Sequence, residues 1–400
     1  MTGLNRVLIA RPLPCSPNDS VVRVYSGGRV AVRANCELDQ SLTAWVPLLT
    51  PIAMARGCRL ELDGEVAESA LRAGRAAQAV LAGWYPGLHE IEVAATRVAE
   101  PGLPRADGVG AFFSGGVDSF YSLLEHADEI THLIFVSGFD IGLHKAGLTS
   151  RTLEAVREVA AASGKELVEI RTNLRRLSNR YLDWGRQYHG SALAGIAQLL
   201  SPHLGRVLVP ATFADDHAWG SHRLLDPVWS SEVEVVHDLP VPRVQKLARV
   251  AESDLAMRWL RVCYSAGDSE YNCGHCEKCL RTMIALRALG RLSRAATLPH
   301  EIDPGLVRGL RLKGAGKVFA EENLAALRAM PHRDRGLERA LATALRLAPW
   351  HAFVRRTVRR YESGRQRGRS FIVRCRAALS RRWRRVVDGR RGLLSRPDSS

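Results

Sequence analysis

The chain of 400 residues is 46% hydrophobic and 24% charged, which fits a globular protein with one large core or two smaller ones and excludes a wholly disordered chain. No apolar run approaches the roughly 18 to 20 residues that cross a bilayer, and the apolar stretch near the start is too short for a secretory signal, so we expect a cytoplasmic protein without a transmembrane segment. The formal net charge of +16 is concentrated in residues 351–400, whereas the first 350 residues, with 41 basic and 38 acidic side chains, are close to neutral.

The first 106 residues combine strand-like and helix-like patterns. Short β-prone runs occur at residues 21–26 (VVRVYS), 29–34 (RVAVRA) and 89–98 (HEIEVAATRV), and residues 66–85 repeat apolar side chains every three to four positions. We therefore predict a small α+β domain over residues 1–106, in which no chemistry is visible. The segment AEPGLPRADG that closes it contains two prolines and two glycines, which is typical of a linker.

Strand-like and helix-like segments alternate from residue 107 onward. The expected strands are residues 109–113, 131–136, 166–171 and 206–211, and the expected helices begin near Asp118 and cover residues 151–163 and 189–200. This alternation is typical of an α/β fold with a doubly wound parallel sheet. We predict such a domain over residues 107–295.

The sequence SGGVDS, residues 114–119, joins the first of these strands to the first helix. In a doubly wound sheet this loop lies at the carboxyl edge, and the helix directs its unpaired N–H groups there, which makes the position an anion site. Gly115 and Gly116 allow the backbone to approach a phosphate closely. Ser114 and Ser119 can donate hydroxyl hydrogen bonds, and Asp118 can help to hold Mg²⁺. The spacing matches neither a Walker A loop nor G-x-G-x-x-G.

This loop resembles the PP-loop, the pyrophosphate-binding loop of the N-type ATP pyrophosphatase superfamily, which has an adenine nucleotide alpha hydrolase-like fold. The resemblance implies that ATP is cleaved between its α and β phosphates, while a substrate oxygen attacks the α phosphorus to form an adenylate. It assigns catalysis to Asp118 and Ser119. The ATP-binding residues that it implies are Ser114, Gly115, Gly116, Val117, Asp118, Ser119, Thr172 and Asn173. For Thr172 and Asn173, a turn that caps the next helix is the alternative.

Two further polar segments of this region are candidates for function. Residues 211–227 (ATFADDHAWGSHRLLDP) follow a predicted strand and are rich in groups that bind substrates or ions; a merely solvated loop is the alternative. In PRVQKLARV, residues 242–250, Arg243 and Lys246 are suited to counter phosphate charge. An ordinary amphipathic helix face is the alternative there.

Four of the eight cysteines lie between residues 263 and 279. Cys273, Cys276 and Cys279 form C-x-x-C-x-x-C, and Cys263 lies ten residues before the first of them. Two-residue spacings place thiolates around one metal ion in a tight knuckle, and four sulfur ligands favour a structural Zn²⁺. An iron–sulfur cluster and unligated thiols are the alternatives.

The motif CGHCEKC, with Arg281 two positions later and SGGVDS upstream, is similar to that of the 7-cyano-7-deazaguanine synthases. This resemblance covers mainly residues 109–285. It implies ATP-dependent adenylation of a carboxylate or amide-like oxygen with release of pyrophosphate, leading to amide or nitrile formation or a related ligation on a small-molecule carboxylate. Three alternatives stay open: a tRNA thiolation or modification enzyme, a PP-loop epimerase acting on UDP-muramoyl peptides, and a nucleotide-binding protein without catalysis.

The C-terminal part divides into a helical extension and a basic tail. Residues 296–350 are predicted to be helical, with a pair of helices over residues 318–350. Residues 351–400 contain 16 arginines and three acidic residues and can contact nucleic acid or an anionic surface. The alternative is a solvated extension, because the whole chain is rich in arginine, with 51 arginines and six lysines.

Overall fold

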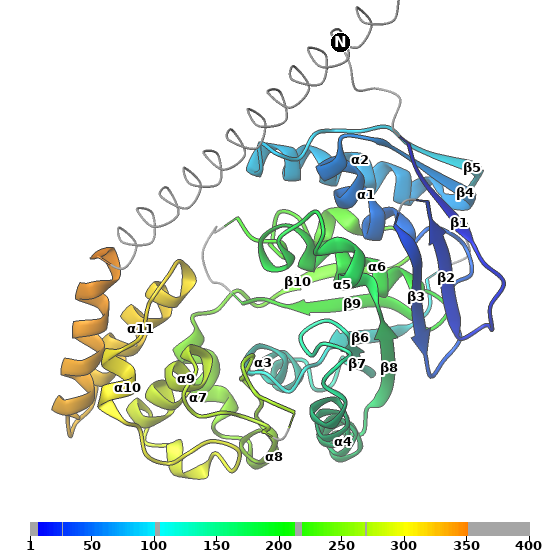
Figure 1. Cartoon of the computed structure of the whole chain (residues 1–400). Coiled ribbons are helices and arrows are strands. Elements are labelled where there is room, and N and C mark those ends of the chain that lie inside the picture. Colours follow the sequence, from blue (N-terminus) through cyan, green and yellow to red (C-terminus); the bar gives the residue numbers. More distant parts are fainter. Residues whose placement is uncertain (1–6, 26, 101–104, 213–217, 269, 351–400) are drawn as a thin grey trace, which may run out of the picture.

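The computed structural model describes residues 7–25, 27–100, 105–212, 218–268 and 270–350. Ten strands form one mixed, mostly parallel sheet in the order β10-β9-β6-β7-β8-β3-β2-β1-β4-β5 (Figure 1). The predicted α/β architecture with C-terminal helices is confirmed at this level. The Arg-rich tail lies outside the described residues. Within those ranges, none of the helices has the length and apolar composition needed to span a bilayer.

The predicted strands and helices overlap observed elements, whereas the elements at residues 7–12, 45–56, 59–67 and 234–238 were not predicted. The strands are β1 Val7–Pro12, β2 Asp19–Val24, β3 Gly28–Ala34, β4 Arg59–Ala67, β5 Val93–Ala99, β6 Gly108–Phe112, β7 His132–Ser137, β8 Glu166–Thr172, β9 Leu204–Pro210 and β10 Glu234–Asp238. The helices are α1 Trp45–Arg56, α2 Glu68–Trp84, α3 Val117–Glu125, α4 Ala146–Ala162, α5 Leu174–Ser178, α6 His189–Leu199, α7 Arg243–Val250, α8 Asp254–Trp259, α9 Glu277–Ala288, α10 Pro304–Arg308 and α11 Ala315–Ala329. A further helix covers residues 335–350.

The strands β6 to β10 are parallel and carry helices on both faces. Because successive side chains of a strand point to opposite faces, Phe112 of β6 packs in one core with α1 and α6, whereas Ala111 packs in a second core with α3, α4 and α7. Figure 1 shows these two helical layers on opposite sides of the sheet. The strand order reverses at β6, with β7 and β8 on one side of it and β9 and β10 on the other.

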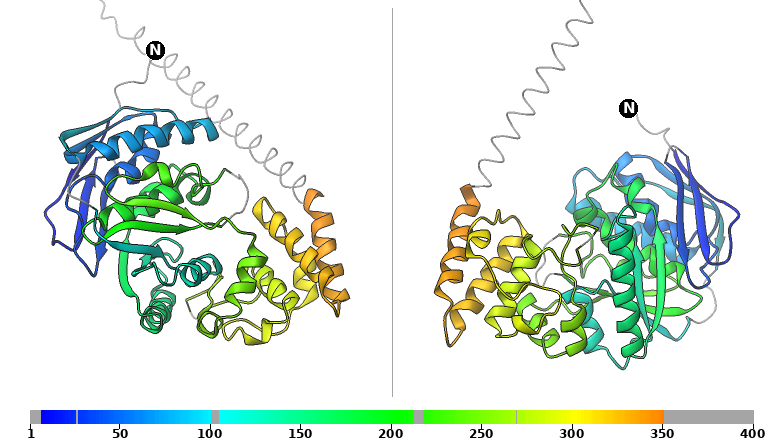
Figure 2. Two further views of the ribbon diagram at one scale, coloured as in Figure 1. Left: turned by 180° about the vertical axis from the view of Figure 1, so that it is seen from behind. Right: turned by 60° about the horizontal axis from the view of Figure 1, so that its bottom comes forward.

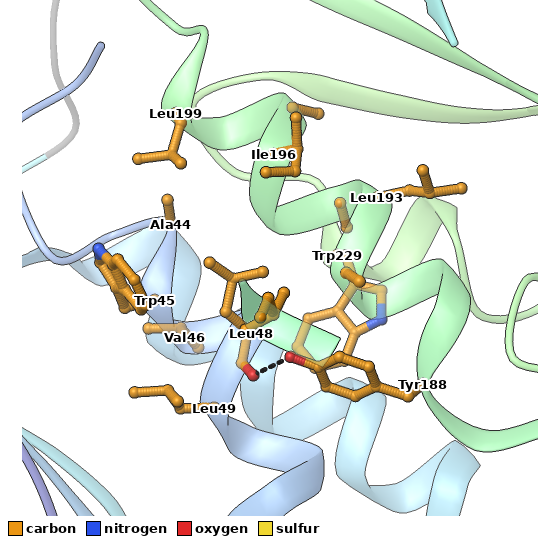
Figure 3. Packing of buried hydrophobic residues seen from close by; sticks show 14 of the residues in the cluster. Ala44, Trp45, Val46, Leu48, Leu49, Tyr188, Leu193, Ile196, Leu199 and Trp229 are labelled. Carbon is orange, nitrogen blue, oxygen red and sulfur yellow. Dashed lines mark hydrogen bonds between the residues drawn. The ribbon is translucent and has the colours of Figure 1, made fainter. Parts of the chain in front are cut away.

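The N-terminal strands continue the same sheet. β3 pairs antiparallel with β8, with Val32 opposite Thr172, and β3, β2 and β1 are joined by antiparallel pairing. The helix α1 packs on α6 in the shared core, where the Tyr188 hydroxyl donates a hydrogen bond of 2.5 Å to the carbonyl of Leu48 (Figure 3). The N-terminal region therefore buries its apolar helix α1 directly against the part of the molecule that contains β6 to β10.

The C-terminal helices attach to the opposite end of the molecule. α11 packs against α9, and residues such as Ile284 of α9, Leu327 of α11 and Leu341 of the last helix form a third apolar core. Figure 2 shows this group of helices beside α7 and α9, away from β1 to β3. The predicted helical pair over residues 318–350 is confirmed, with α11 as its first helix.

Candidate active site and metal centre

The loop of residues 114–119 follows β6 and turns directly into α3. Gly115 has a φ of 74°, a left-handed conformation that favours glycine, and its carbonyl accepts a hydrogen bond of 2.7 Å from the Arg261 N–H. Gly116 is the N-cap of α3 and offers no side chain to the first N–H groups of the helix. The Ser119 hydroxyl donates to the Gly116 carbonyl over 3.1 Å. The loop is thus held in a tight turn with helix donors open for an anion.

A cavity of about 470 Å³ opens beside this loop. It lies at the carboxyl ends of β6, β7 and β9, where the strand order reverses, which is the usual ligand position in open α/β sheets. Five of the six predicted loop residues line it. They are Ser114, Gly116, Val117, Asp118 and Ser119. The loop residues that the sequence singled out thus lie together on the wall of one cavity.

Cationic side chains dominate the polar lining of this cavity. They are Arg175, Arg243, Arg261, Lys278 and Arg281, against the carboxylates Asp118 and Asp140. Arg243, Arg261 and Arg281 are buried, and the Nε atom of each has no hydrogen-bond partner in the described part of the chain. Burial lowers the pKa of Arg261 and of Lys278, and lowers that of Arg281 to about 10. A surplus of buried, incompletely paired cations favours an anionic ligand.

Two cations of α7 converge on Asp118 of α3. The Arg243 guanidinium lies 3.3 Å and the Lys246 ammonium 3.5 Å from the Asp118 carboxylate. Lys246 is fully buried, and burial lowers its pKa while Asp118 opposes that effect. A second ion pair joins the same helices outside the cavity, where Arg249 lies 2.8 Å from Glu125. Asp118, Arg243 and Lys246 thus form a group of one carboxylate and two cations at the start of α3.

One part of the cavity lining is aromatic. Phe139 and Trp184 contact each other edge to face, and the Arg175 guanidinium lies 4.6 Å from the Trp184 ring centre. The buried Arg175 Nε has no hydrogen-bond partner among the described residues, and burial lowers the Arg175 pKa. His189, at the start of α6, also lines the cavity, and burial lowers its pKa. Aromatic rings thus lie beside cations in this lining, here at Arg175 and also where the Arg281 guanidinium lies 4.2 Å from the Phe319 ring centre.

Thr172 and Asn173 lie outside this cavity, separated from the loop. The Thr172 hydroxyl donates to the Ala31 carbonyl over 2.8 Å, and the Asn173 side chain accepts from the Ala31 N–H over 2.9 Å and donates to the Arg29 carbonyl over 3.1 Å. The alternative of a helix-capping turn has partial support, because the Leu174 N–H donates to the Thr172 hydroxyl over 3.2 Å. In the structure both side chains join β8 to β3.

Replacing Asn173 with alanine is expected to lower stability and leave ATP affinity unchanged. Two hydrogen bonds to β3 would be lost, at a cost of about 1 to 2 kcal/mol in the free energy of unfolding. Urea unfolding measures the first effect, and calorimetric titration with Mg–ATP measures the second. An ATP affinity that falls severalfold in a folded variant would instead return Asn173 to the nucleotide site.

The segment of residues 211–227 contributes to the cavity through Thr212, Trp219 and Ser221. Asp215, Asp216 and His217 lie outside the described residues. Asp226 is fully buried and accepts from the Ser221 hydroxyl over 2.6 Å, and it lies 2.7 Å from the His237 ring nitrogen. Asp226 thereby links this segment to β10.

The four predicted metal ligands come together. The sulfur atoms of Cys263, Cys273, Cys276 and Cys279 all lie within 4.8 Å of one another. Cys263 and Cys276 are 3.7 Å apart, and Cys273 and Cys279 are 3.9 Å apart. Four thiolates at a zinc–sulfur distance of about 2.3 Å occupy a tetrahedron with edges of roughly 3.8 Å. The cluster can therefore bind zinc or a similar metal ion.

The cysteine cluster is built into the first turn of α9. Cys276 is the N-cap of this helix and accepts a hydrogen bond from the Cys279 N–H. The hydrogen bond that the Cys279 thiol donates to Cys276 lowers the pKa of Cys276 and raises that of Cys279, so the pair favours one thiolate, at Cys276. Lys278 and Arg281 leave the same turn toward the cavity. The cysteines thus fix two of the cavity's cations.

Several cavity residues were not identified from the sequence. Asp140, Arg175, Arg261 and Lys278 lie on four separate segments, and only the fold brings them together. Lys278 could have been predicted, because it lies between Cys276 and Cys279 and a residue between two metal ligands points away from the metal. For Arg261 and Arg175 no local pattern distinguishes them from the many surface arginines of this chain.

Comparisons with known proteins add no identification, since neither a family model, nor a curated protein, nor a solved structure matches this chain.

Proposed function

We propose that this chain is an ATP-dependent adenylating enzyme with a PP-loop, acting on a small carboxylate. The observation that carries the proposal is the position of SGGVDS: it follows β6 at the reversal of strand order and lines a cavity with five cations. We also propose that the fold is a doubly wound sheet of the PP-loop type. The two helical layers on opposite faces of the parallel strands support this proposal.

ATP fits the donors, cations and aromatic rings of the cavity. The first N–H groups of α3, which no side chain caps, can bind the β and γ phosphates together with Arg243. Phe139 and Trp184 offer an apolar place for the base. Mg²⁺ is commonly held by one or two carboxylates together with substrate phosphates. Asp118 supplies such a carboxylate next to the loop.

The charge of the lining favours an anionic acceptor. Five cations and two carboxylates line the cavity, and the buried Lys246 adds a further cation beside Asp118. ATP carries about four negative charges, and a bound Mg²⁺ offsets two of them. The cations that remain favour a negatively charged group such as a carboxylate. Lys278 and Arg281 of α9, which also line the cavity, are suited to hold that group.

The proposed reaction is an in-line displacement at the α phosphorus. An oxygen of the acceptor carboxylate forms the new P–O bond, and the bond to the bridging α–β oxygen breaks, so that an acyl adenylate and pyrophosphate are formed. The donors of the loop and Arg243 stabilise the charge that develops on pyrophosphate. The adenylate makes the carboxyl carbon open to attack by a nucleophile, with AMP leaving.

For the metal centre we propose zinc in a structural role. A cluster of two or four irons distributes the same four thiolates over several metal atoms and needs wider sulfur separations. Sulfurs within 4.8 Å of one another suit one ion. Among the described cysteines, Cys263 alone lines the cavity, and it belongs to this cluster. This arrangement favours ligation chemistry over sulfur transfer, which would need a further thiol.

The test is ATP–pyrophosphate exchange with radiolabelled pyrophosphate and pools of small carboxylic acids. The proposal expects exchange that depends on both Mg²⁺ and one acid of the pool, with AMP rather than ADP as product. ATP binding without exchange in any pool would favour the non-catalytic alternative. ADP as product would contradict cleavage between the α and β phosphates.

Replacing Arg243 with glutamine is expected to weaken Mg–ATP binding about 10- to 100-fold, because a buried cation beside the loop is lost. Arg249→Gln is the matched control, since it removes an exposed arginine from the same helix and should leave the affinity unchanged. Isothermal titration measures both. Equal affinities for the two variants would remove Arg243 from the phosphate site.

A further inference from the structure

The strands β1 to β3 carry arginines on the face that they turn away from α1. Val30 and Val32 of β3 point into the core, whereas Arg29 and Arg33 are exposed on the opposite face. Figure 1 shows these strands at the rim of the molecule, with the α1 layer on their inner side. Val21 of β2 is buried on this outer face, where the arginine stems can cover it.

The strand register aligns these arginines in rows. Arg11 of β1 lies directly opposite Arg23 of β2, and Arg23 lies opposite Arg29 of β3. Two rows further on the same face, beyond Ala31, Arg33 of β3 lies between Asp19 of β2 and Arg171 of β8. Like charges directly opposite each other on neighbouring strands destabilise a sheet. The stability of the sheet therefore does not explain why arginines lie opposite one another.

Few carboxylates balance this face. Asp63 binds Arg11 over 2.6 Å, and Asp19 lies 3.7 Å from Arg33. Within the described ranges, no carboxylate lies in ion-pair distance of Arg23, Arg29 or Arg171. A groove of about 490 Å³ lies on the part of this face formed by β3 and the end of β8, and no acidic residue is part of its lining. It is lined by Arg29, Ala31, Arg33, Leu143, Arg171, Thr172 and Asn173.

We propose that this face binds the phosphate backbone of a single-stranded nucleic acid. Guanidinium groups bind phosphates in a bidentate manner, and neighbouring arginines of one row lie on adjacent strands, whose backbones are about 4.8 Å apart. Tyr25, which is 42% exposed and lies under the Arg11 guanidinium, offers a ring on which a base can stack. A membrane surface would need neither the rows nor the ring.

The cavity and the groove have separate linings. Phe139, Asp140 and Ile141 line the cavity, and Leu143, two residues further on, lines the groove. The inference is independent of the proposed adenylation, because it concerns binding by residues outside the cavity.

The experiment measures the affinity of the full chain for a labelled single-stranded RNA of mixed sequence, over a range of salt concentrations. The variant Arg23→Gln/Arg29→Gln/Arg171→Gln removes the three unpaired cations. We expect at least about tenfold weaker binding and a salt slope smaller by about two, since each lost phosphate contact on a single strand removes roughly 0.7 from the slope. Thermal unfolding of this variant should be unchanged or shifted upward, because like-charge pairs are relieved.

The matched control is Arg75→Gln/Arg308→Gln/Arg311→Gln, which makes the same charge change at exposed arginines elsewhere. Both variants retain residues 351–400, so any contribution of the tail is common to them. Equal affinity and equal salt slope in the two variants would overturn the proposal. Anionic lipid vesicles provide the other arm: if the face variant loses vesicle binding and keeps RNA binding, the face is a membrane surface and the inference is wrong.

Discussion

Replacing Asp118 with alanine or asparagine is expected to reduce ATP–pyrophosphate exchange by about 10²- to 10³-fold, the effect of losing one preorganised charged group at a reacting phosphate. In the structure Asp118 holds Arg243 and Lys246 at the start of the loop helix, and in the proposed reaction it also offers a carboxylate to Mg²⁺. The asparagine variant retains the shape and removes the charge, which separates the two electrostatic roles from packing.

The control is Glu125→Ala on the same helix. It breaks the outer ion pair with Arg249, which joins the same two helices away from the cavity. We expect wild-type exchange from this variant, and circular dichroism spectra of both variants that match the wild type. If Asp118→Asn exchanges pyrophosphate at the wild-type rate, the carboxylate has no part in the reaction.

Replacing Cys276 with serine is expected to reduce the metal content from about one ion per chain to nearly none, and to lower the affinity for Mg–ATP or the acceptor as well. A structural zinc contributes its binding free energy to folding, so the region around α9 should unfold at a lower temperature. Since Lys278 and Arg281 leave the first turn of α9, loosening this turn also displaces two cavity cations. Elemental analysis measures the metal content, thermal unfolding measures the stability, and isothermal titration measures the affinity.

Cys36→Ser is the matched control, because Cys36 is half-buried and lies outside the cluster. It should retain the metal and the melting temperature. A Cys276→Ser variant that is stable and active without metal would show that the cluster is dispensable. Two to four irons per chain in the wild type, with strong visible absorbance, would overturn zinc and favour iron–sulfur chemistry.

The sequence predicted those parts of the molecule that are encoded by short spacings. The alternation of apolar strands with helices located β6 to β9 and α3, α4 and α6 within a few residues. The C-x-x-C-x-x-C spacing grouped three thiols on one turn, and the fourth joined them. These patterns are local, so packing between distant segments does not alter the strands, helices and cysteine turn that they predict.

What the sequence did not show depends on packing between distant segments. α1 has no polar face and contains Pro47 and Pro51, so it lacks the amphipathic period that marks a helix, and it is stabilised by burial on all sides. The pairing of β3 with β8 depends on two edges meeting, which no local pattern encodes. The same holds for Arg175 and Arg261, whose cavity positions are set by the fold.

The β3–β8 pairing has a consequence for how the chain folds during synthesis. The Thr172 hydroxyl bonds to the Ala31 carbonyl, 141 residues earlier in the chain. Contacts of such high sequence separation slow folding, because a long loop must close before they form. While the chain is being made, β1 to β3 can pair locally, but the outer edge of β3 stays open until β8 has emerged. During that interval the nascent protein exposes a strand edge that can pair with other chains.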